Sequence, residues 1–492
     1  MDTLPDIVLE KIFNMIDVEW IYFISLVCKR FHGLISAQRK KNGFTNILYR
    51  THISTIVKSV SLCEFAKRDG CMWNENICAC AAIENNIEVL KYARNNHCPW
   101  DWRTHYFAVI HDHQLIQRYA EENGCPWRVR FECVGDTYYD IEIQNHCAIQ
   151  YLPSKKIKKI PADIKYLKRV KNINISGNRL ENVPDELKEL PNLVSLGLSY
   201  NILDTISPVI FELKLNHLDL MCNKLTSVTG LGRMQSLLTL NLSCNSLFAI
   251  SSDIMQLKNL IHLEMDSNWI TCLPDELYNL VALENLSLNY NKVTELSNFR
   301  SKSLRVLSLE WNRIWSINLD FSSIRCLTEL YLRGNNITSL PDSIKMLENL
   351  RWLDIGENEF TRFPMCVTEI SSLERLLIDE NDIYAIPRDI KKLYNLKSLG
   401  LCNTKLCYIP YELRELEQLN SIEIRENNIS CIIPLTTMKT LQYIDVSNNR
   451  LISLPDLSKL TELMEIDVRY NDLGDVPSVT ETGAKIIYSD YV

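Results

Sequence analysis

One eleven-residue pattern, L-x-x-L-x-L-x-x-N-x-L, recurs fourteen times between residues 170 and 473 and constrains the fold more than any other feature of the chain. Successive copies lie 21 to 23 residues apart, and position nine is asparagine in every copy except the eleventh, where Thr404 stands. A unit this short cannot bury its leucines alone, so neighbouring copies must stack into a solenoid. We number the repeats one to fourteen, from Val170 to Leu463, and the positions within each pattern one to eleven.

Each repeat is expected to begin with a short strand and to turn at the asparagine. In repeat six, Leu286 and Leu288 alternate with polar residues, which puts both leucines on one face of a strand. Asn291 comes next, and a buried Asn side chain can bond the backbone of a turn where strand pairing has ended. Most repeats continue with an apolar residue and a proline, such as Leu273-Pro274, and proline ends strand pairing and opens a short helical turn. At Thr404 we expect a local adjustment of this turn.

The repeat pattern resembles the intracellular leucine-rich repeats of about 23 residues that carry an L-x-x-L-P segment. The resemblance implies an α/β leucine-rich-repeat solenoid, a horseshoe with parallel inner strands. A stacked solenoid is mainly a long concave surface, which favours binding over catalysis. Residues 157–164 are similar to the back half of one more, degenerate repeat. We therefore assign residues 131–169 to a linker and N-terminal cap, and residues 474–492 to a C-terminal cap.

Residues 1–41 show helical periodicity of a different kind. Pro5 suits a first helical turn, and the apolar residues after it have more surface than a segment this short can bury alone. The Leu4-Pro5 start and the later run L-V-C-K-R-F resemble the F-box, an all-α module that binds the Skp1-like adaptor of SCF-type cullin-RING ubiquitin ligases. The alternative is a plain helical cap for the repeats. The resemblance places these residues in the Skp1 interface or its supporting core: Leu4, Pro5, Ile7, Leu9, Ile12, Val27, Cys28, Phe31 and Leu34.

A second repeat, with a period of 27 residues, occupies residues 62–130 after a connector over residues 42–61. Cys, Trp and Ala each recur at this interval, and the pattern suits pairs of short antiparallel helices closed by a turn. It resembles the ankyrin-like repeats of giant DNA viruses that infect amoebae and of some protists. The resemblance implies a helical linker that sets the distance between the two ends of the chain.

The same segment also invites a metal-binding interpretation. Residues 63–147 hold eight Cys and five His, but a structural zinc site needs paired ligands at fixed spacing. The cysteines follow the helical period instead, which favours small buried thiols. A further candidate, His262-x-Glu264-x-Asp266, spreads its side chains too far along one strand to hold one ion. We expect no metal and no cofactor.

The composition of the chain indicates its cellular compartment and the kind of molecule that it binds. The net charge is −8, with +2 in residues 1–160 and −10 in the remainder, which argues against nucleic acid as the main partner of the repeats. No apolar run approaches the length of a membrane span, and the N-terminus lacks the basic start of a signal peptide. The 17 cysteines are scattered singly, as is typical of reduced thiols. We expect a cytoplasmic protein, in the host cytoplasm if the chain is viral.

The inner face of the solenoid is the candidate binding site. Positions two, three, five, seven and eight should point toward a partner, and over fourteen repeats they carry 16 acidic and 8 basic residues. Four consecutive repeats add an aromatic residue each, and aromatic residues ringed by charge are typical of protein-binding hot spots. The alternative is a solvated acidic face that serves solubility. The hypothesis is a basic protein ligand docking on Tyr290, Glu310, Trp311, Tyr331, Arg333, Trp352, Asp354, Glu357, Asp379 and Glu380.

None of the phosphate-binding, nucleotide-binding or hydrolase motifs that carry a known mechanism occurs in the chain. We therefore expect a non-catalytic protein. The prediction is a substrate-recognition adaptor of an SCF-type cullin-RING ubiquitin ligase, in which the F-box holds the ligase and the repeats hold the target. Such an adaptor acts by raising the effective concentration of its target near the ligase. The main rival is a protein-binding scaffold with no link to ubiquitin.

Overall fold

A computed structural model describes residues 53–68, 73–135, 137–143, 148–149, 155–297, 299–474 and 483–488. The residues of the F-box resemblance lie outside this described part. The described chain groups into two compact units. The first unit holds the residues up to 150 together with 157–172 and 189–192, and the second holds the rest of the repeats. No helix among the described residues is long and apolar enough to cross a membrane.

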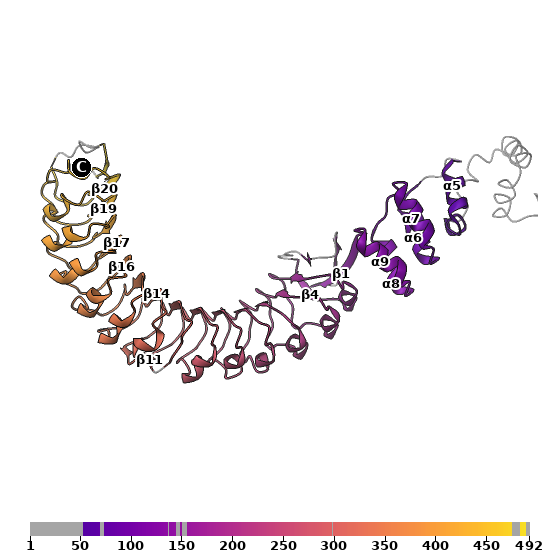
Figure 1. Cartoon of the computed structure of the whole chain (residues 1–492), viewed down its shortest axis with the longest axis horizontal. Coiled ribbons are helices and arrows are strands. Elements are labelled where there is room, and N and C mark those ends of the chain that lie inside the picture. Colours follow the sequence, from indigo (N-terminus) through magenta and orange to yellow (C-terminus); the bar gives the residue numbers. More distant parts are fainter. Residues whose placement is uncertain are drawn as a thin grey trace, which may run out of the picture. The chain divides into compact units, whose positions relative to one another are not determined.

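The first unit begins with short helices that reproduce the 27-residue period. Four helices of nine residues each form two successive helix pairs, α6 with α7 and α8 with α9 (Figure 1). The segment thus contains helices that recur at the interval seen in the sequence, whereas its assignment to ankyrin-like repeats stays a prediction. The helices are α4 (Ile53–Ile56), α5 (Val60–Arg68), α6 (Glu75–Ile83), α7 (Ile87–Asn95), α8 (Trp102–Ile110) and α9 (Gln114–Glu122).

The recurring residues of this period close each helix pair. Ala93 is fully buried, and its carbonyl oxygen accepts a hydrogen bond from the backbone N–H of Cys98. The Cys98 thiol then donates to the carbonyl oxygen of Asn74, which caps the start of α6. One period later, the Cys125 thiol makes the same bond to Asp101, the cap of α8. Each cysteine therefore ties the end of a helix pair to the start of the same pair, as small buried thiols can.

A small antiparallel sheet ends the first unit, where the sequence indicated only a linker and a cap. β1 (Trp127–Cys133) pairs with β2 (Thr137–Ile143) and with β4 (Ile157–Lys159). Alternate residues of β1 are buried, so one face packs on the core while the other is more exposed. The short strand β3 (Ala148–Ile149) and the 3-10 helix η2 (Ala162–Tyr166) complete this part.

The second unit is a solenoid with a parallel sheet on its inner side (Figure 1). Adjacent strands pair in register, so that position four of each repeat faces position four of the next, as Leu286 faces Leu263 and Leu307. The apolar residues at positions one, four and six are buried in all fourteen repeats; most of them are leucines. The strands are β5 (Asn172–Asn174), β6 (Ser195–Gly197), β7 (His217–Asp219), β8 (Thr239–Asn241), β9 (His262–Glu264), β10 (Asn285–Ser287), β12 (Val306–Ser308), β14 (Glu329–Tyr331), β15 (Trp352–Asp354), β16 (Arg375–Leu377), β17 (Ser398–Gly400), β18 (Ser421–Glu423), β19 (Tyr443–Asp445), β20 (Glu465–Asp467) and β21 (Lys485–Ile487).

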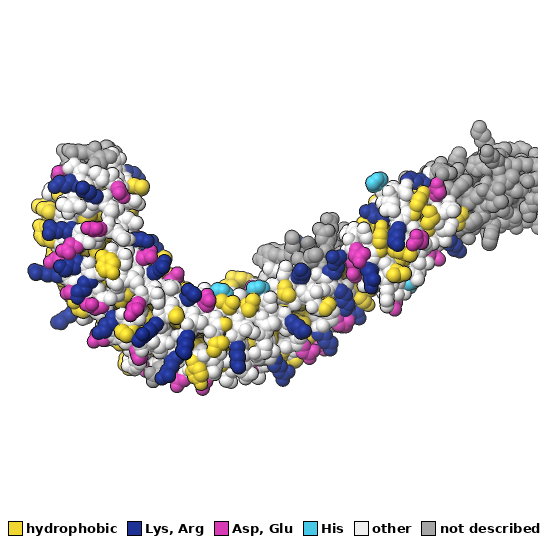
Figure 2. Space-filling model, in the orientation of Figure 1, with side chains coloured by type: hydrophobic (Ala, Val, Ile, Leu, Met, Phe, Trp, Pro, Cys, Tyr) yellow, Lys and Arg dark blue, Asp and Glu magenta, His cyan; other side chains and the backbone are white. Residues whose placement is uncertain are grey.

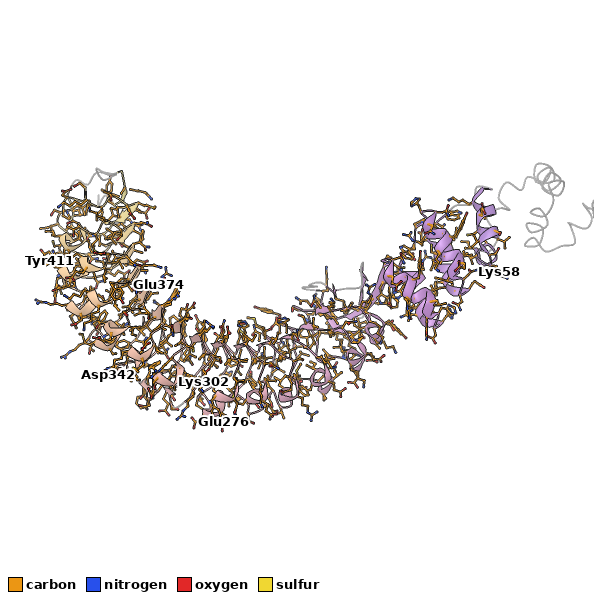
Figure 3. The ribbon with its side chains drawn as sticks, viewed as in Figure 1. Lys58, Glu276, Lys302, Asp342, Glu374 and Tyr411 are labelled. Atoms are coloured by element: carbon orange, nitrogen blue, oxygen red, sulfur yellow. The ribbon has the colours of Figure 1, made fainter. Side chains whose placement is uncertain are left out.

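Short 3-10 helices form the outer side of the solenoid, and many begin just after the expected proline, as at Pro274 and Pro341. In Figure 3 Glu276, Asp342 and Tyr411, which belong to these helices, lie on the outer side, whereas Glu374 at position two lies on the inner side. A second, two-stranded sheet joins β11 (Glu295–Leu296) to β13 (Ser316–Ile317). The helices are η3 (Asp185–Glu189), η4 (Pro208–Glu212), η5 (Leu231–Arg233), η6 (Ile254–Gln256), η7 (Asp275–Asn279), η8 (Phe321–Ile324), η9 (Asp342–Met346), η10 (Met365–Glu369), η11 (Arg388–Lys392), η12 (Tyr411–Glu415) and η13 (Ile433–Leu435).

The asparagines at position nine bond the backbone of their turns, as predicted, and they also form a buried ladder that joins successive repeats. The side-chain amide of Asn291 donates to the carbonyl oxygens of Leu288 and Met265 at 3.1 and 2.9 Å, and its oxygen accepts from the backbone N–H of Ile270 at 3.0 Å. Each Asn therefore satisfies turn groups in its own repeat and in the preceding one. At Thr404 the hydroxyl donates to Leu401 and contacts the oxygen of the next ladder residue, which is the expected local adjustment.

Candidate protein-binding face

The residues at position eight lie in the turn along one edge of the inner face, and their backbone has a left-handed conformation. Position eight has a positive φ in successive repeats, with values near 54° at Tyr290 and Trp311 and 69° at Gly334. Most side chains avoid this region, so the ladder bonds of the next residue, Asn, must hold the turn in place. The sequence pattern gave no sign of this conformation, because residues as different as Tyr, Cys, Glu and Gly occupy the position.

Tyr290 and Trp311 stack at this edge. Their ring centroids lie 5.9 Å apart with an interplanar angle of 7°, and both side chains are exposed. A Cβ atom at Gly334 would lie 2.8 Å from the ring of Trp311, so this ring packs directly on the glycine backbone. The two rings are therefore held in place before any partner binds.

Tyr331 and Trp352 form a different pair on the strands β14 and β15. Their centroids lie 5.7 Å apart at 51°, and the guanidinium of Arg375 covers Trp352 at 4.3 Å. Burial and the hydrogen bond from the Tyr331 hydroxyl to Glu329 raise the pKa of Tyr331 above its usual value. The four predicted aromatic residues thus form two separate pairs, and the chain's own cation already covers the second pair.

Arg333 draws together most of the predicted carboxylates. Its guanidinium lies 2.6 Å from Glu357, 3.6 Å from Asp379 and 3.5 Å from Glu380. The space for it comes from Gly356, where a Cβ atom would lie only 2.6 Å from Nη1 of Arg333. We call Arg333, Asp354, Glu357, Asp379 and Glu380 the Arg333 cluster.

The electrostatics of the Arg333 cluster are those of a half-buried network. Burial raises the pKa of Asp354 to about 6, although the N–H of Gly356 and the charge of Arg333 act in the opposite direction. Burial alone would lower the pKa of Arg333, but the hydrogen bond to Glu357 and the surrounding carboxylates raise it instead. The guanidinium therefore offsets charge that the inner face cannot otherwise solvate.

Repeats five to seven carry carboxylates that are bound differently. Asn241 donates to Glu264 at 2.7 Å, and Ser287 and the N–H of Asn289 donate to Asp266 at 2.6 and 2.7 Å. Burial raises the pKa of Glu264, Asp266 and Glu310. Repulsion from neighbouring carboxylates adds to this at Glu264 and Glu310, whereas the charge of Arg333 acts in the opposite direction at Glu310. Among the described residues none of these three carboxylates forms an ion pair.

Two exposed aromatic residues beyond the predicted positions continue the edge. Phe248 lies three residues after the motif Asn of repeat four, and Trp269 directly follows the motif Asn of repeat five. Their ring centroids are 6.2 Å apart. The ammonium of Lys292 lies 3.6 Å over the ring of Trp269. Sequence reasoning missed both rings because it considered only strand positions; large aromatic residues just after the motif Asn were the signal available.

The opposite edge of the strands, at position two, is a charged groove of about 800 Å³ over repeats six to eleven. Glu284 pairs with Arg305 at 3.4 Å, and Glu374 pairs with Lys397 at 2.7 Å. Over all fourteen repeats position two carries four basic and two acidic residues, so the acidic excess of the inner face lies at the other positions. In Figure 2 basic and acidic side chains interleave over the side of the repeats in view.

The structure does not test the remaining predicted site residues. The residues assigned to Skp1 binding, from Leu4 to Leu34, lie outside the described residues. Within the described part, no group of three or more His, Cys, Asp or Glu side chains is arranged to hold a metal ion.

Comparison with known proteins identifies the repeats. A family model for the leucine-rich repeat matches residues 235–293, 302–360 and 325–383. A leucine-rich-repeat protein of Leptospira interrogans is 26% identical with a TM-score of 0.56, and the match covers 66% of this chain and 78% of that one. An internalin of Listeria monocytogenes is 23% identical, with a TM-score of 0.54 and coverage of 61% and 88%. The PEPR1–AtPEP1 structure is 26% identical, with a TM-score of 0.50 and coverage of 66% and 53%. No curated protein matches the sequence.

The chain therefore contains a leucine-rich-repeat solenoid with a parallel sheet, and it fits a protein-binding scaffold. The matched residues hold the stacked edge rings and the whole Arg333 cluster. These features are thus built on the part of the chain whose repeat type is shown by sequence as well as by structure.

Proposed function

We propose that this protein is a non-catalytic substrate-recognition adaptor of an SCF-type cullin-RING ubiquitin ligase. The F-box-like residues 1–41 would bind a Skp1-like adaptor, the helical repeats would act as an ankyrin-like spacer, and the solenoid would bind a basic protein target. The work would take place in the cytoplasm, of a host cell if the chain is viral.

The proposed binding of a target is supported by the residues of the inner face. Exposed rings at Tyr290 and Trp311 border half-buried carboxylates such as Glu310, and aromatic residues next to charge are enriched where proteins bind one another. Burial raises the pKa of Glu310, although the charge of Arg333 acts in the opposite direction, and a further cation from a partner would favour the ionised carboxylate.

The ligase half is supported by the sequence pattern of residues 4–35 alone. The sequence of this segment predicts short helices with more apolar surface than they can bury alone, which would require a partner, and the pattern Leu4-Pro5 with Val27-Cys28 resembles that of the F-box. The second candidate function, a scaffold with no link to ubiquitin, is favoured by the position of the family match, which lies wholly within the repeats.

The test is the affinity of the purified full-length protein for a Skp1 homologue. A Leu9→Asp, Val27→Asp double variant should lose this binding while it keeps the circular dichroism of the repeats. Binding by the wild-type protein alone would support the adaptor. If the wild-type protein does not bind, the N-terminal segment is a structural cap and the scaffold function stands in its place.

The target half needs a separate measurement on the same preparations. Charge reversal at Asp354, Glu357 and Asp379 is expected to weaken capture of a basic target that docks at the Arg333 cluster, and unchanged affinity would mean that the target does not dock at this part of the inner face. The same variant should bind the Skp1 homologue normally, because the altered residues lie in the repeats.

A further inference from the structure

Four exposed aromatic rings lie on four successive repeats along the turn side of the inner face. We call Phe248, Trp269, Tyr290 and Trp311 the aromatic strip; their side chains are 62%, 45%, 57% and 40% exposed. Single exposed apolar residues are common, but here an exposed ring occurs on each of four consecutive repeats, and the rings contact one another in two pairs.

The repeat fold does not require these rings. Position eight holds Cys222 in repeat three and Asn403 in repeat eleven, and both adopt the same backbone conformation as Tyr290. Position ten holds Ser246 in repeat four, where repeat five has Trp269. Since small or polar residues serve equally well in the turn, the rings need an explanation other than folding.

The strip is arranged before binding. Phe248 contacts Trp269, Tyr290 stacks on Trp311, and Trp311 rests on the backbone of Gly334. Rings that are already ordered lose little conformational entropy when a partner covers them, and this is what makes rigid aromatic residues effective in interfaces.

The charges beside the strip define the chemistry of its partner. Glu264, Asp266 and Glu310 belong to the same repeats, and the hydrogen bonds to Glu264 and Asp266 come from neutral donors rather than from cations. The ring of Trp269 already accepts a cation of this chain, Lys292, at 3.6 Å. An apolar and basic partner would complement both the rings and the carboxylates.

We propose that the aromatic strip is the docking surface for the protein target, and that it takes a segment in which Arg or Lys alternates with apolar residues. Apolar side chains would cover the rings, and the basic side chains would reach Glu264, Asp266 and Glu310. The inference rests on the proposed binding of a basic target and places that binding on repeats four to seven instead of on the Arg333 cluster.

The probe is a phage-displayed library of random twelve-residue peptides, selected on the full-length protein. Enriched peptides are then synthesised, and their dissociation constants are measured by fluorescence anisotropy. The strip variant is Tyr290→Ala, Trp311→Ala. The matched control is Tyr394→Ala, Tyr411→Ala, which removes two tyrosines that are similarly exposed, at 56% and 60%. Circular dichroism and the urea midpoint confirm that both variants fold.

The expected result is a set of peptides rich in Arg or Lys and apolar residues, which bind the strip variant about 30-fold or more weakly and the control within about 3-fold of wild type. Acidic peptides, the absence of any enriched peptide, or equal affinity for both variants would overturn the inference. Sedimentation of the two variants tests for a second copy of the chain as occupant. Loss of a dimer in the strip variant alone would also overturn it.

A third variant separates this inference from the proposed function. If Asp379→Asn, Glu380→Gln abolishes peptide binding while the strip variant binds normally, the target docks at the Arg333 cluster and only the inference fails. Binding of a Skp1 homologue, measured on the same samples, reports on the ligase half independently.

Discussion

Repeats eight to ten and repeats five to seven both carry several carboxylates on the inner face, but these carboxylates have different partners in the two regions. In the first region Arg333 lies among Glu357, Asp379 and Glu380, so these carboxylates share one cation of the chain itself. In the second region Glu264 and Asp266 are held only by neutral donors. A network closed by the chain's own cation stabilises the fold, whereas carboxylates without such a cation are available to a partner.

The comparison predicts first that Arg333 is a structural residue. Replacing Arg333 by Gln leaves several half-buried carboxylates without their cation, and we expect a loss of about 3 kcal/mol in the free energy of unfolding at pH 7. The control is Arg351→Gln, because Arg351 is 70% exposed and its pairing with Glu374 at 3.6 Å should contribute less than about 0.5 kcal/mol. Urea unfolding of the two variants measures the difference, and equal losses would remove the distinction between the regions.

The second prediction concerns pH. Burial raises the folded-state pKa of Asp354 to about 6, above its ordinary value of 3.8, so the folded state holds this proton more tightly than the unfolded state does. The ionised carboxylate therefore lowers stability, and the loss grows between about pH 4 and pH 6 and stays constant above. Asp354→Asn should raise stability by about 2 kcal/mol at pH 7.5 and have little effect near pH 4.

Glu374→Gln is the matched control for this pH dependence. The hydrogen bond from Lys397 lowers the pKa of Glu374, so removing this carboxylate should not stabilise the protein at neutral pH. The measurement is the urea midpoint of both variants from pH 4 to pH 8. A gain that is independent of pH in Asp354→Asn would show that burial of charge is not the cause.

The sequence predicted the repeated parts of the fold well and the individual contacts poorly. Period-two leucines and the position-nine Asn dictate strand register and the ladder, because every repeat must satisfy the same backbone groups. The pairing of Arg333 with carboxylates one and two repeats away depends on the missing side chain of Gly356, which no periodicity reveals. The strand pair β1 and β2 was likewise missed, because a single hairpin has no repeat to identify it.

The candidate site was predictable in composition but not in arrangement. Acidic excess and four aromatic residues could be read from the strand positions, yet the side chains divide into Tyr290 with Trp311 at the turn and Tyr331 with Trp352 on the strands. The division arises from position eight, whose positive φ directs its residues to the edge. Phe248 and Trp269 fall after the motif Asn, so reasoning from the strand alone could not include them.

The third prediction tests the contact between Trp311 of repeat seven and Gly334 of repeat eight, where the two regions meet. Gly334→Ala places a methyl group where φ is +69° and where the ring of Trp311 lies 2.8 Å away. We expect a loss of about 1 to 2 kcal/mol, in part from the left-handed backbone and in part from displacement of the ring. In a Trp311→Ala background only the backbone part should remain.

A double-mutant cycle measures the difference as a coupling energy, for which about 0.5 to 1 kcal/mol is expected. Zero coupling would mean that the ring does not rest on Gly334 and that the aromatic strip is less ordered than the stacked geometry indicates. The single Trp311→Ala variant supplies the reference for this cycle and is one of the two changes in the binding experiment.

The smallest expected effect concerns the stability cost of the aromatic strip. Phe248→Ala should change the free energy of unfolding by no more than about 0.5 kcal/mol, because the ring is 62% exposed and its removal leaves no cavity. The control is Phe360→Ala in repeat nine, whose ring is 1% exposed and whose loss should cost about 3 to 5 kcal/mol. A change this small would mean that the exposed rings do not serve folding, which is what the proposed docking surface requires. A loss above about 1 kcal/mol at Phe248 would instead make the strip part of the packing of the repeats. The contrast between a region that contains its own cation and a partner-binding region would then rest on the carboxylates alone.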